Sequence, residues 1–184
     1  TADITWGGNN NFNDTILNVT GHNITLNDEA NGFVLSGVAV GNLLTLNCAD
    51  TITQSGAITG NGGVTQRGLF GGGTLVLSQA NTYLGTTTIQ SGTTIELTAT
   101  ATNTIPSSAT IDVQSGAFLN VTGLTASTLV LASGQTLKGS GTVTGKTTVS
   151  SNSAIAPGAS PGILNTGDVT YASGSNFSVE LNGT

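Results

Sequence analysis

Apolar residues recur at steps of six along residues 77–155, separated mostly by Thr, Ser, Gly and other polar or small residues. A helix of about 3.6 residues per turn does not bring such residues onto one face, whereas a short strand followed by a bend does. Because three such sides close one coil, the pattern predicts an all-β chain folded as a three-sided β-solenoid, a parallel β-helix. The residues that carry the spacing are Leu77, Tyr83, Ile89 and Ile95, then Val113 and Leu119, then Leu131, Leu137, Val143, Val149 and Ile155.

Steps of eighteen residues connect apolar positions that a solenoid would stack on successive rungs. One such series is Leu77, Ile95, Val113, Leu131 and Val149, and another is Leu119, Leu137 and Ile155. Turn signals fall between the strands, at Gln90-Ser-Gly92, Gln114-Ser-Gly116, Ala132-Ser-Gly134 and Ala172-Ser-Gly174. Gly116 and Gly134 are eighteen residues apart, but Gly92 and Gly116 are twenty-four apart. Either the rung length varies, therefore, or residues 99–103 are a bulged insertion.

Residues 1–70 keep the alternation of short strands and turns, but with looser spacing. The glycines at 71–73 are followed at once by a strand, which favours a turn between rungs over a flexible linker. We therefore expect one β-helix segment over residues 1–184, with irregular N-terminal rungs at 1–70 and regular repeat rungs at 71–184. Neither end shows a boundary signal, which indicates a segment of a longer exported protein.

Two other folds compete with the solenoid. Gly and β-branched residues fill every window, and each costs up to about 1 kcal/mol in a helix interior, so a helical fold is excluded. An antiparallel sandwich also gives short strands at regular intervals, but it usually joins them by two-residue turns such as Asn-Gly. The Asn-Gly pairs at Asn31, Asn61 and Asn182 lie off the main period, which favours the solenoid.

The amino-acid composition excludes some classes of binding partner. Only 7% of the residues are charged, so Thr, Ser, Asn and the backbone must keep the surface soluble. The net charge is −6 and the only cations are Arg67, Lys138 and Lys146, which leaves no basic stripe for nucleic acid. No apolar run approaches the roughly 18 residues of a membrane span, so we expect no membrane contact by this segment.

Cys48 is the only cysteine, so the chain has no internal disulfide and no multi-cysteine metal site. Leu44, Leu46 and Cys48 alternate along one run, which predicts that all three point inward from a single strand. We therefore expect the thiol to be buried and not reactive.

The stretch from Gly72 to Tyr83, Gly-Gly-Thr-Leu-Val-Leu-Ser-Gln-Ala-Asn-Thr-Tyr, continues as Leu-Gly-Thr-Thr-Thr-Ile-Gln-Ser-Gly92. It resembles the autotransporter-associated β-strand repeat, a passenger-associated repeat, almost residue by residue. It departs from the family pattern at Gln79 and Thr86, where the family usually has Gly; both are turn positions. The stretches from Leu137 to Gly145, from Ile155 to Gly162 and from Val179 to Gly183 are also similar to the segment that commonly follows such repeats.

This resemblance covers about half of the chain and implies a right-handed β-helix in a large exported passenger, often followed by an outer-membrane barrel. It places the segment in a secreted or bacterial cell-surface protein. It implies no catalytic residues and no cofactor.

Candidate catalytic groups are sparse. His22, the sole histidine, lies in a predicted surface turn without a second histidine or a cysteine cluster for zinc. No Gly-x-Ser-x-Gly sequence presents a nucleophile to it. Polysaccharide lyases and hydrolases share the β-helix, but the nine acids are dispersed and only Asp28 and Glu29 adjoin, facing opposite ways in a strand. We therefore expect no enzyme activity, with a polysaccharide-degrading enzyme as the least favoured reading.

Two further sequence patterns give only weak evidence for a binding site. Oxygen ligands cluster in the loop at residues 27–32, but without the spacing of a calcium motif, so a solvated Asx turn is the better account and no metal site is expected. Threonine runs at 86–88, 93–94 and 98–102 could form an outward ladder as in ice-binding solenoids. Such a ladder needs a threonine at one position of every rung, which the runs do not supply, so β-propensity explains them.

The sequence thus predicts a structural stalk that extends or presents adhesive or effector regions. The alternative is an adhesin or glycan-binding module that contacts host or environmental glycans or surface proteins through Trp6, Tyr83 or an exposed Asn/Thr face. For Trp6, covering the end of the apolar column is the competing role. Open ends also predict end-to-end self-association.

Overall fold

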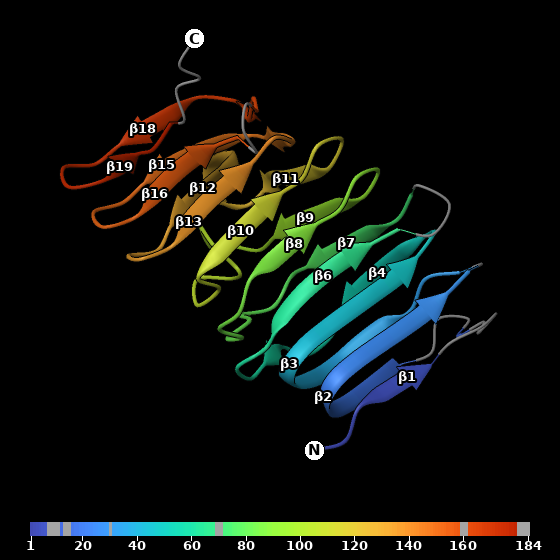
Figure 1. The fold of residues 1–184 in the computed structure, drawn as a ribbon. Coiled ribbons are helices and arrows are strands. Elements are labelled where there is room, and N and C mark those ends of the chain that lie inside the picture. The colour runs from blue at the N-terminus through green and yellow to red at the C-terminus, as the bar shows by residue number, and fades with distance from the viewer. Residues whose placement is uncertain (7–11, 13–15, 30, 69–71, 159–161, 180–184) are drawn as a thin grey trace, which may run out of the picture.

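A computed structural model describes the chain except residues 7–11, 13–15, 30, 69–71, 159–161 and 180–184. The described chain is a parallel β-solenoid of about eight turns. The coils advance along one axis from the N-terminal to the C-terminal end (Figure 1). Among the described residues the only helical element is the short 3-10 turn Thr125–Ser127.

The strands stack in three parallel ladders, one for each side of the coil. Each strand pairs with the strand one turn away, and every pairing between named strands is parallel. The antiparallel sandwich is therefore excluded for the described residues.

The first ladder runs the whole length of the solenoid. Its members, in order, are β1 (Ile4–Trp6), β2 (Ile16–Asp28), β3 (Val34–Cys48), β6 (Gly63–Arg67), β8 (Thr87–Ile89), β10 (Thr110–Val113), β13 (Thr136–Gly139), β16 (Ala154–Pro157) and β19 (Asn176–Phe177). Strands β2 and β3 are long because each turns a corner, with shifts of their register at the bend.

The second ladder pairs with the first half of β3, and the third covers the remaining side near the C-terminal end. The second ladder consists of β4 (Thr51–Gln54), β7 (Thr74–Leu77), β9 (Thr94–Thr98), β11 (Phe118–Gly123), β14 (Thr142–Thr144) and β17 (Asn165–Thr166). The third consists of β12 (Thr128–Leu131), β15 (Lys146–Val149) and β18 (Val169–Tyr171), and the short β5 (Ile58–Thr59) pairs with β3.

A single aliphatic column fills the solenoid. All the inward positions predicted from the six-residue spacing are buried, with at most 3% of each residue exposed. Leu44, Leu46 and Cys48 are completely buried, as expected. Desolvation raises the pKa of the Cys48 thiol, and its Sγ lies 3.3 Å from the carbonyl oxygen of Asn31.

The predicted eighteen-residue stacking is only partly correct. It holds for Leu131 with Val149 and for Leu137 with Ile155. Leu119, however, pairs with Ile95 and Val143, and not with Leu137. The rung length varies, because residues 101 and 102 accept hydrogen bonds from Thr125 and Val130 and so form the third side of their rung; they are not a bulge.

The interval between paired inward positions of the first ladder differs along the chain, and the division into irregular and regular rungs at residue 70 stays a prediction. Ile4, Ile24, Leu44 and Val64 pair in succession at intervals of twenty residues. From Val64 onward the partners are Thr87, Ile111, Leu137, Ile155 and Phe177, at unequal intervals. That the segment is one domain of a longer protein stays a prediction.

Candidate functional site

A column of threonines runs along the outer face of the first ladder. Thr5, Thr25, Thr45, Thr65 and Thr88 pair in register on five successive rungs, and we call them the threonine column. Each has inward-facing neighbours on both sides in its strand, so its own side chain points to solvent. Sequence reasoning missed this column, although a threonine lies between two inward positions every twenty residues from Thr5 to Thr65.

The threonine column continues into the charged pair Asp112 and Lys138. Asp112 pairs in register with Thr88, and Lys138 pairs with Asp112. Lys138 Nζ lies 3.6 Å from Asp112 Oδ2, and 45% and 23% of the two side chains are exposed. Such a pair adds at most about 1 kcal/mol to stability, so both groups remain able to bind a partner.

A polar hollow lies beside this pair, at the corner where the first ladder turns into the second. Three successive turns supply serines to it, and Gly139 and Gly158 complete its wall. Its volume is about 540 Å³. We call it the corner groove, and its side chains are Ser91, Asp112, Gln114, Ser115, Lys138 and Ser140.

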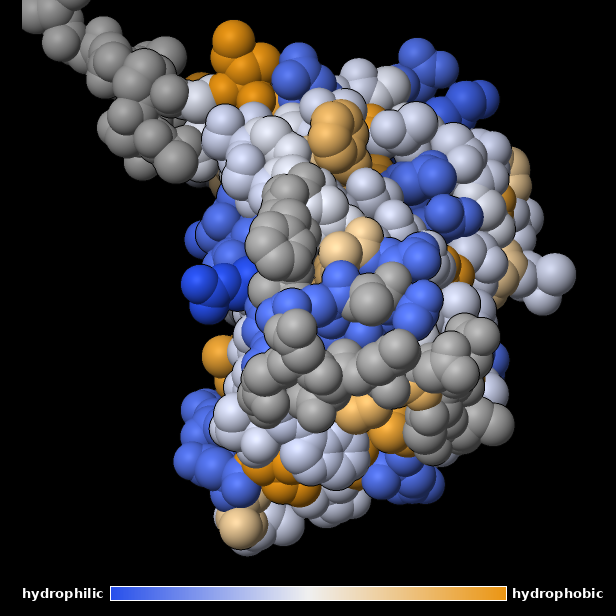
Figure 2. Space-filling model, turned by 90° about the vertical axis from the view of Figure 1, so that its right-hand side faces the viewer, coloured by the Kyte–Doolittle hydropathy of each residue, from blue (hydrophilic) through white to orange (hydrophobic). Residues whose placement is uncertain are grey.

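The corner groove extends further along the solenoid. A second hollow of about 520 Å³ shares Ser115 and Ser140 with it and reaches Ile163 and Asn165. Hydrophilic and intermediate residues cover most of the side of the molecule shown in Figure 2, with apolar side chains in small separate patches. Because only 7% of the residues are charged, most of the polar groups available to a partner are hydroxyls and amides.

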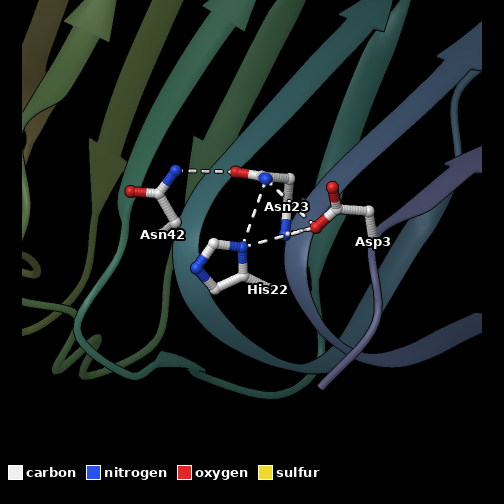
Figure 3. A network of polar contacts seen from close by, with 4 residues as sticks. All are labelled: Asp3, His22, Asn23 and Asn42. Atoms are coloured by element: carbon white, nitrogen blue, oxygen red, sulfur yellow. Dashed lines mark hydrogen bonds and ion pairs between the residues drawn. The ribbon is translucent and has the colours of Figure 1, made fainter.

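A polar network joins the first three rungs around His22 (Figure 3). Asn23 donates from its backbone and its side chain to Asp3 Oδ1, at 3.1 and 3.0 Å, and Asn42 donates to Asn23 Oδ1 at 2.7 Å. His22 Nδ1 lies 3.4 Å from the same Asp3 oxygen. The two hydrogen bonds from Asn23, more than His22, hold the pKa of Asp3 below its usual value.

His22 lies on the surface as expected, but inside β2 at a register shift and not in a turn between strands. Its neighbours are amides and one carboxylate, which hold the corner together and supply no nucleophile. Within the described residues, no three His, Cys, Asp or Glu side chains gather as a metal site would require.

Tyr83 cannot contact a ligand at the surface, so that expectation is wrong. Its side chain is completely buried. Its hydroxyl lies 2.6 Å from Thr87 Oγ1, which in turn lies 2.8 Å from Ser108 Oγ. Thr87 and Thr93 are buried as well, so the runs at 86–88 and 93–94 do not face outward as a whole, although Thr88 belongs to the threonine column.

Trp6 remains accessible, with 40% of the residue exposed at the N-terminal end. It pairs in register with Leu26, so it continues the inner column, and its ring lies 5.8 Å from that of Phe12. Phe12 in turn packs edge-on against the buried Phe33 at 5.2 Å. This position agrees with the end-covering role, and ligand contact by Trp6 stays a prediction.

The Asp28 loop is ordered by backbone amides. Asp28 is completely buried, its Oδ2 accepts a hydrogen bond from Phe12 N at 2.8 Å, and its Oδ1 accepts one from Asn31 N at 3.2 Å. An Asx turn bonds the amide two residues on, whereas Asp28 bonds the amide of Asn31 and is completely buried, so the predicted solvated Asx turn is wrong. No helix in the described part of the chain is long and apolar enough to cross a membrane.

Comparison with known proteins finds a relative among bacterial surface proteins. The chain is 33% identical over 174 residues to the Adhesin BmaC autotransporter of Brucella suis biovar 1 (strain 1330). The match covers 94% of this chain but only 5% of that protein. No protein-family model matches the chain, and no solved structure does. The similarity and the parallel β-solenoid together fit an autotransporter passenger.

Proposed function

We propose that this segment is a stalk in a secreted or cell-surface passenger, which holds adhesive or effector regions away from a bacterial envelope. The observation that carries the proposal is the parallel ladder that continues from β1 to β19 without a change of axis (Figure 1). Hydrogen bonds between rungs run along that axis, so bending the rod would strain many of them at once.

Burial supports the same role. The inner column is one continuous cluster of mostly aliphatic residues from Leu17 to Ile155. A rod that is packed along its whole length opens locally with difficulty, which gives stiffness and resistance to proteases outside the cell. We propose no catalytic role and no cofactor for the segment.

Surface display tests the stalk directly. One or two copies of the segment are placed between an outer-membrane anchor and an N-terminal epitope, and the height of the epitope is measured by atomic force microscopy. With about eight turns per copy and roughly 4.8 Å per turn, each copy should add about 40 Å. A second copy that adds much less than the first would contradict a stiff stalk, since a flexible chain lengthens only as the square root of its length.

A second candidate function is direct adhesion by this segment. The corner groove favours it, because a stalk needs no concave polar surface. The relative named as an adhesin supports it too, although the chain corresponds to only 5% of that protein. On this reading the partners are glycans or surface proteins of a host or of the environment.

A further inference from the structure

We propose that the corner groove and the threonine column bind a neutral, extended polysaccharide that runs parallel to the solenoid axis. This goes beyond the stalk role and gives the second candidate function a site and a ligand class. The two functions are independent, because a stiff rod can carry a binding track or lack one.

Polar side chains of the corner groove repeat along the solenoid axis. Ser91, Ser115 and Ser140 lie on three successive turns of one corner. Gly92 N donates to Gly116 O at 2.9 Å, so Ser91 and Ser115 hold the same position on neighbouring turns, about 4.8 Å apart. Gly139 pairs with Val113, so Ser140 on the next turn lies beside Gln114. Polar side chains thus repeat once per rung, at close to the length of one pyranose unit, and successive sugars of an extended chain would each meet a hydroxyl or an amide.

The corner groove offers both donors and acceptors of hydrogen bonds. The Asp112 carboxylate only accepts hydrogen bonds, the Lys138 ammonium only donates, and Gln114 and the serines do both. Adjacent hydroxyls on a sugar ring need this mixture of donors and acceptors on one side. A volume of about 540 Å³ lies within the usual range of about 300–1,000 Å³ for ligand sites.

The charges of the groove and of the whole chain favour a neutral ligand. The groove holds one cation and one anion in contact, and the positions that pair with them on either side are Thr88 and Ala156. An acidic polysaccharide would have to displace Asp112 from Lys138 and approach a protein of net charge −6. Hydroxyl groups of a neutral chain can bind both members of the pair without separating them.

The threonine column supplies a track that leads into the groove. It lies in register with Asp112 and Lys138 and presents one hydroxyl per rung over five rungs. A long chain bound in the groove can therefore continue along the same face. We expect affinity to rise with ligand length until the track is filled.

The test is titration calorimetry on the whole chain with cellohexaose, xylohexaose and mannohexaose as neutral probes. A hexamer of polygalacturonate and a heparin hexasaccharide are the acidic probes. The groove variant is Asp112→Asn with Lys138→Gln. The matched control is Glu96→Gln with Lys146→Gln, which removes the same charges from exposed or partly exposed positions on other faces. Circular dichroism checks that both variants keep the fold.

Saturable binding of a neutral hexasaccharide, weakened about tenfold or more in the groove variant and unchanged in the control, is the expected result. The cello- and xylo-probes against the manno-probe separate a plant or environmental source from a mannose-rich one. Thr45→Val with Thr65→Val should weaken binding of the hexasaccharide, which spans about six rungs, more than binding of the disaccharide of the same sugar, which the groove alone can hold. Absence of binding by all three neutral probes, equal loss in the control, or binding of the acidic probes alone would overturn the proposal.

Discussion

Two buried glutamines show how a side chain in the solenoid depends on its partners. Gln66 lies in the inner column between Leu46 and Ile89, is completely buried, and has no hydrogen-bond partner for either amide atom among the described residues. Gln135 is also buried, but its Nε2 donates to the carbonyls of Ile105 and Ser108, at 2.9 and 2.8 Å. Its Oε1 accepts from Ala132 N and from the side chain of Asn103.

The same substitution should therefore have opposite effects at the two sites. Gln66→Met replaces an unpaired amide by an apolar chain of similar shape and should raise the free energy of unfolding by about 1–3 kcal/mol. Gln135→Met leaves buried donors and acceptors unpaired and should lower it by about 3 kcal/mol or more. Urea unfolding of both variants measures this, and destabilisation by Gln66→Met would show that its amide has a partner in solution.

The buried hydroxyl of Tyr83 should make the stability of the fold depend on pH. Burial raises the pKa of its hydroxyl well above the usual value of about 10. Above about pH 10 the unfolded chain loses this proton while the folded chain keeps it. The free energy of unfolding should therefore be constant below about pH 10 as far as Tyr83 is concerned, and should fall as the pH rises further. Tyr83→Phe should remove part of this fall, and should cost about 1 kcal/mol at neutral pH through loss of the 2.6 Å contact with Thr87. Unfolding midpoints from pH 7 to 11 test it, and identical pH slopes in the two proteins would contradict it.

At the scale of the element, the corners depend on glycine where the backbone has a positive φ and a neighbouring rung lies close. Gly60 has φ +108°, and a Cβ there would lie 2.2 Å from the carbonyl oxygen of Val40. Gly134 has φ +83°, but a Cβ there would meet nothing within 4 Å. Substitutions at the two positions therefore distinguish the cost of backbone strain from the cost of a clash with the next rung.

Gly134→Ala should cost about 1–2 kcal/mol, the strain of an L-residue in the left-handed region. Gly60→Ala should cost at least about 3 kcal/mol, because it adds a clash that only a shift of the neighbouring rung can relieve. Thermal unfolding of both variants provides the comparison. Equal losses would mean that the corner at Gly60 has room the structure does not show.

The sequence predicts the strands and their inward faces better than the register between rungs. Period-two alternation depends on local side chains and correctly buries residues such as Leu77 and Val149. Register depends on how many residues each rung takes up outside its regular strands, and this number ranges from a tight turn to the segment 99–109, which includes the third side of its rung. Leu119 was therefore misplaced, and the turn glycines Gly92, Gly116, Gly134 and Gly174 were found although their spacing was not understood.

The candidate site was harder to predict because it depends on that register. Asp112 and Lys138 are twenty-six residues apart and meet only because their rungs pair. Tyr83 is a candidate ligand contact in the sequence, yet the same six-residue spacing places it inward, and its complete burial excludes surface contact.

At the scale of the whole molecule, the last described rungs of the solenoid expose two aromatic residues. Tyr171 and Phe177 pack edge-on at 6.1 Å, and 45% and 59% of them are exposed. We expect the purified segment to associate through this end, and Phe177→Lys to reduce the association through charge repulsion and loss of apolar contact. Sedimentation velocity over a range of concentrations measures it, with Leu84→Lys on the side of the rod as the control. Equal association in both variants would place the contact elsewhere.

The central claim is that the rungs stack in register as a stiff rod, and distances between spin labels along the outer face of the first ladder test it most directly. Nitroxides are attached through cysteines at Thr25 paired in turn with Thr88, Lys138 and Ala156, which are three, five and six rungs away. Electron paramagnetic resonance should give distances that rise linearly by about 4.8 Å per rung, near 14, 24 and 29 Å, with narrow distributions. Broad distributions, or distances that do not grow with rung number, would contradict a stiff solenoid and with it the stalk.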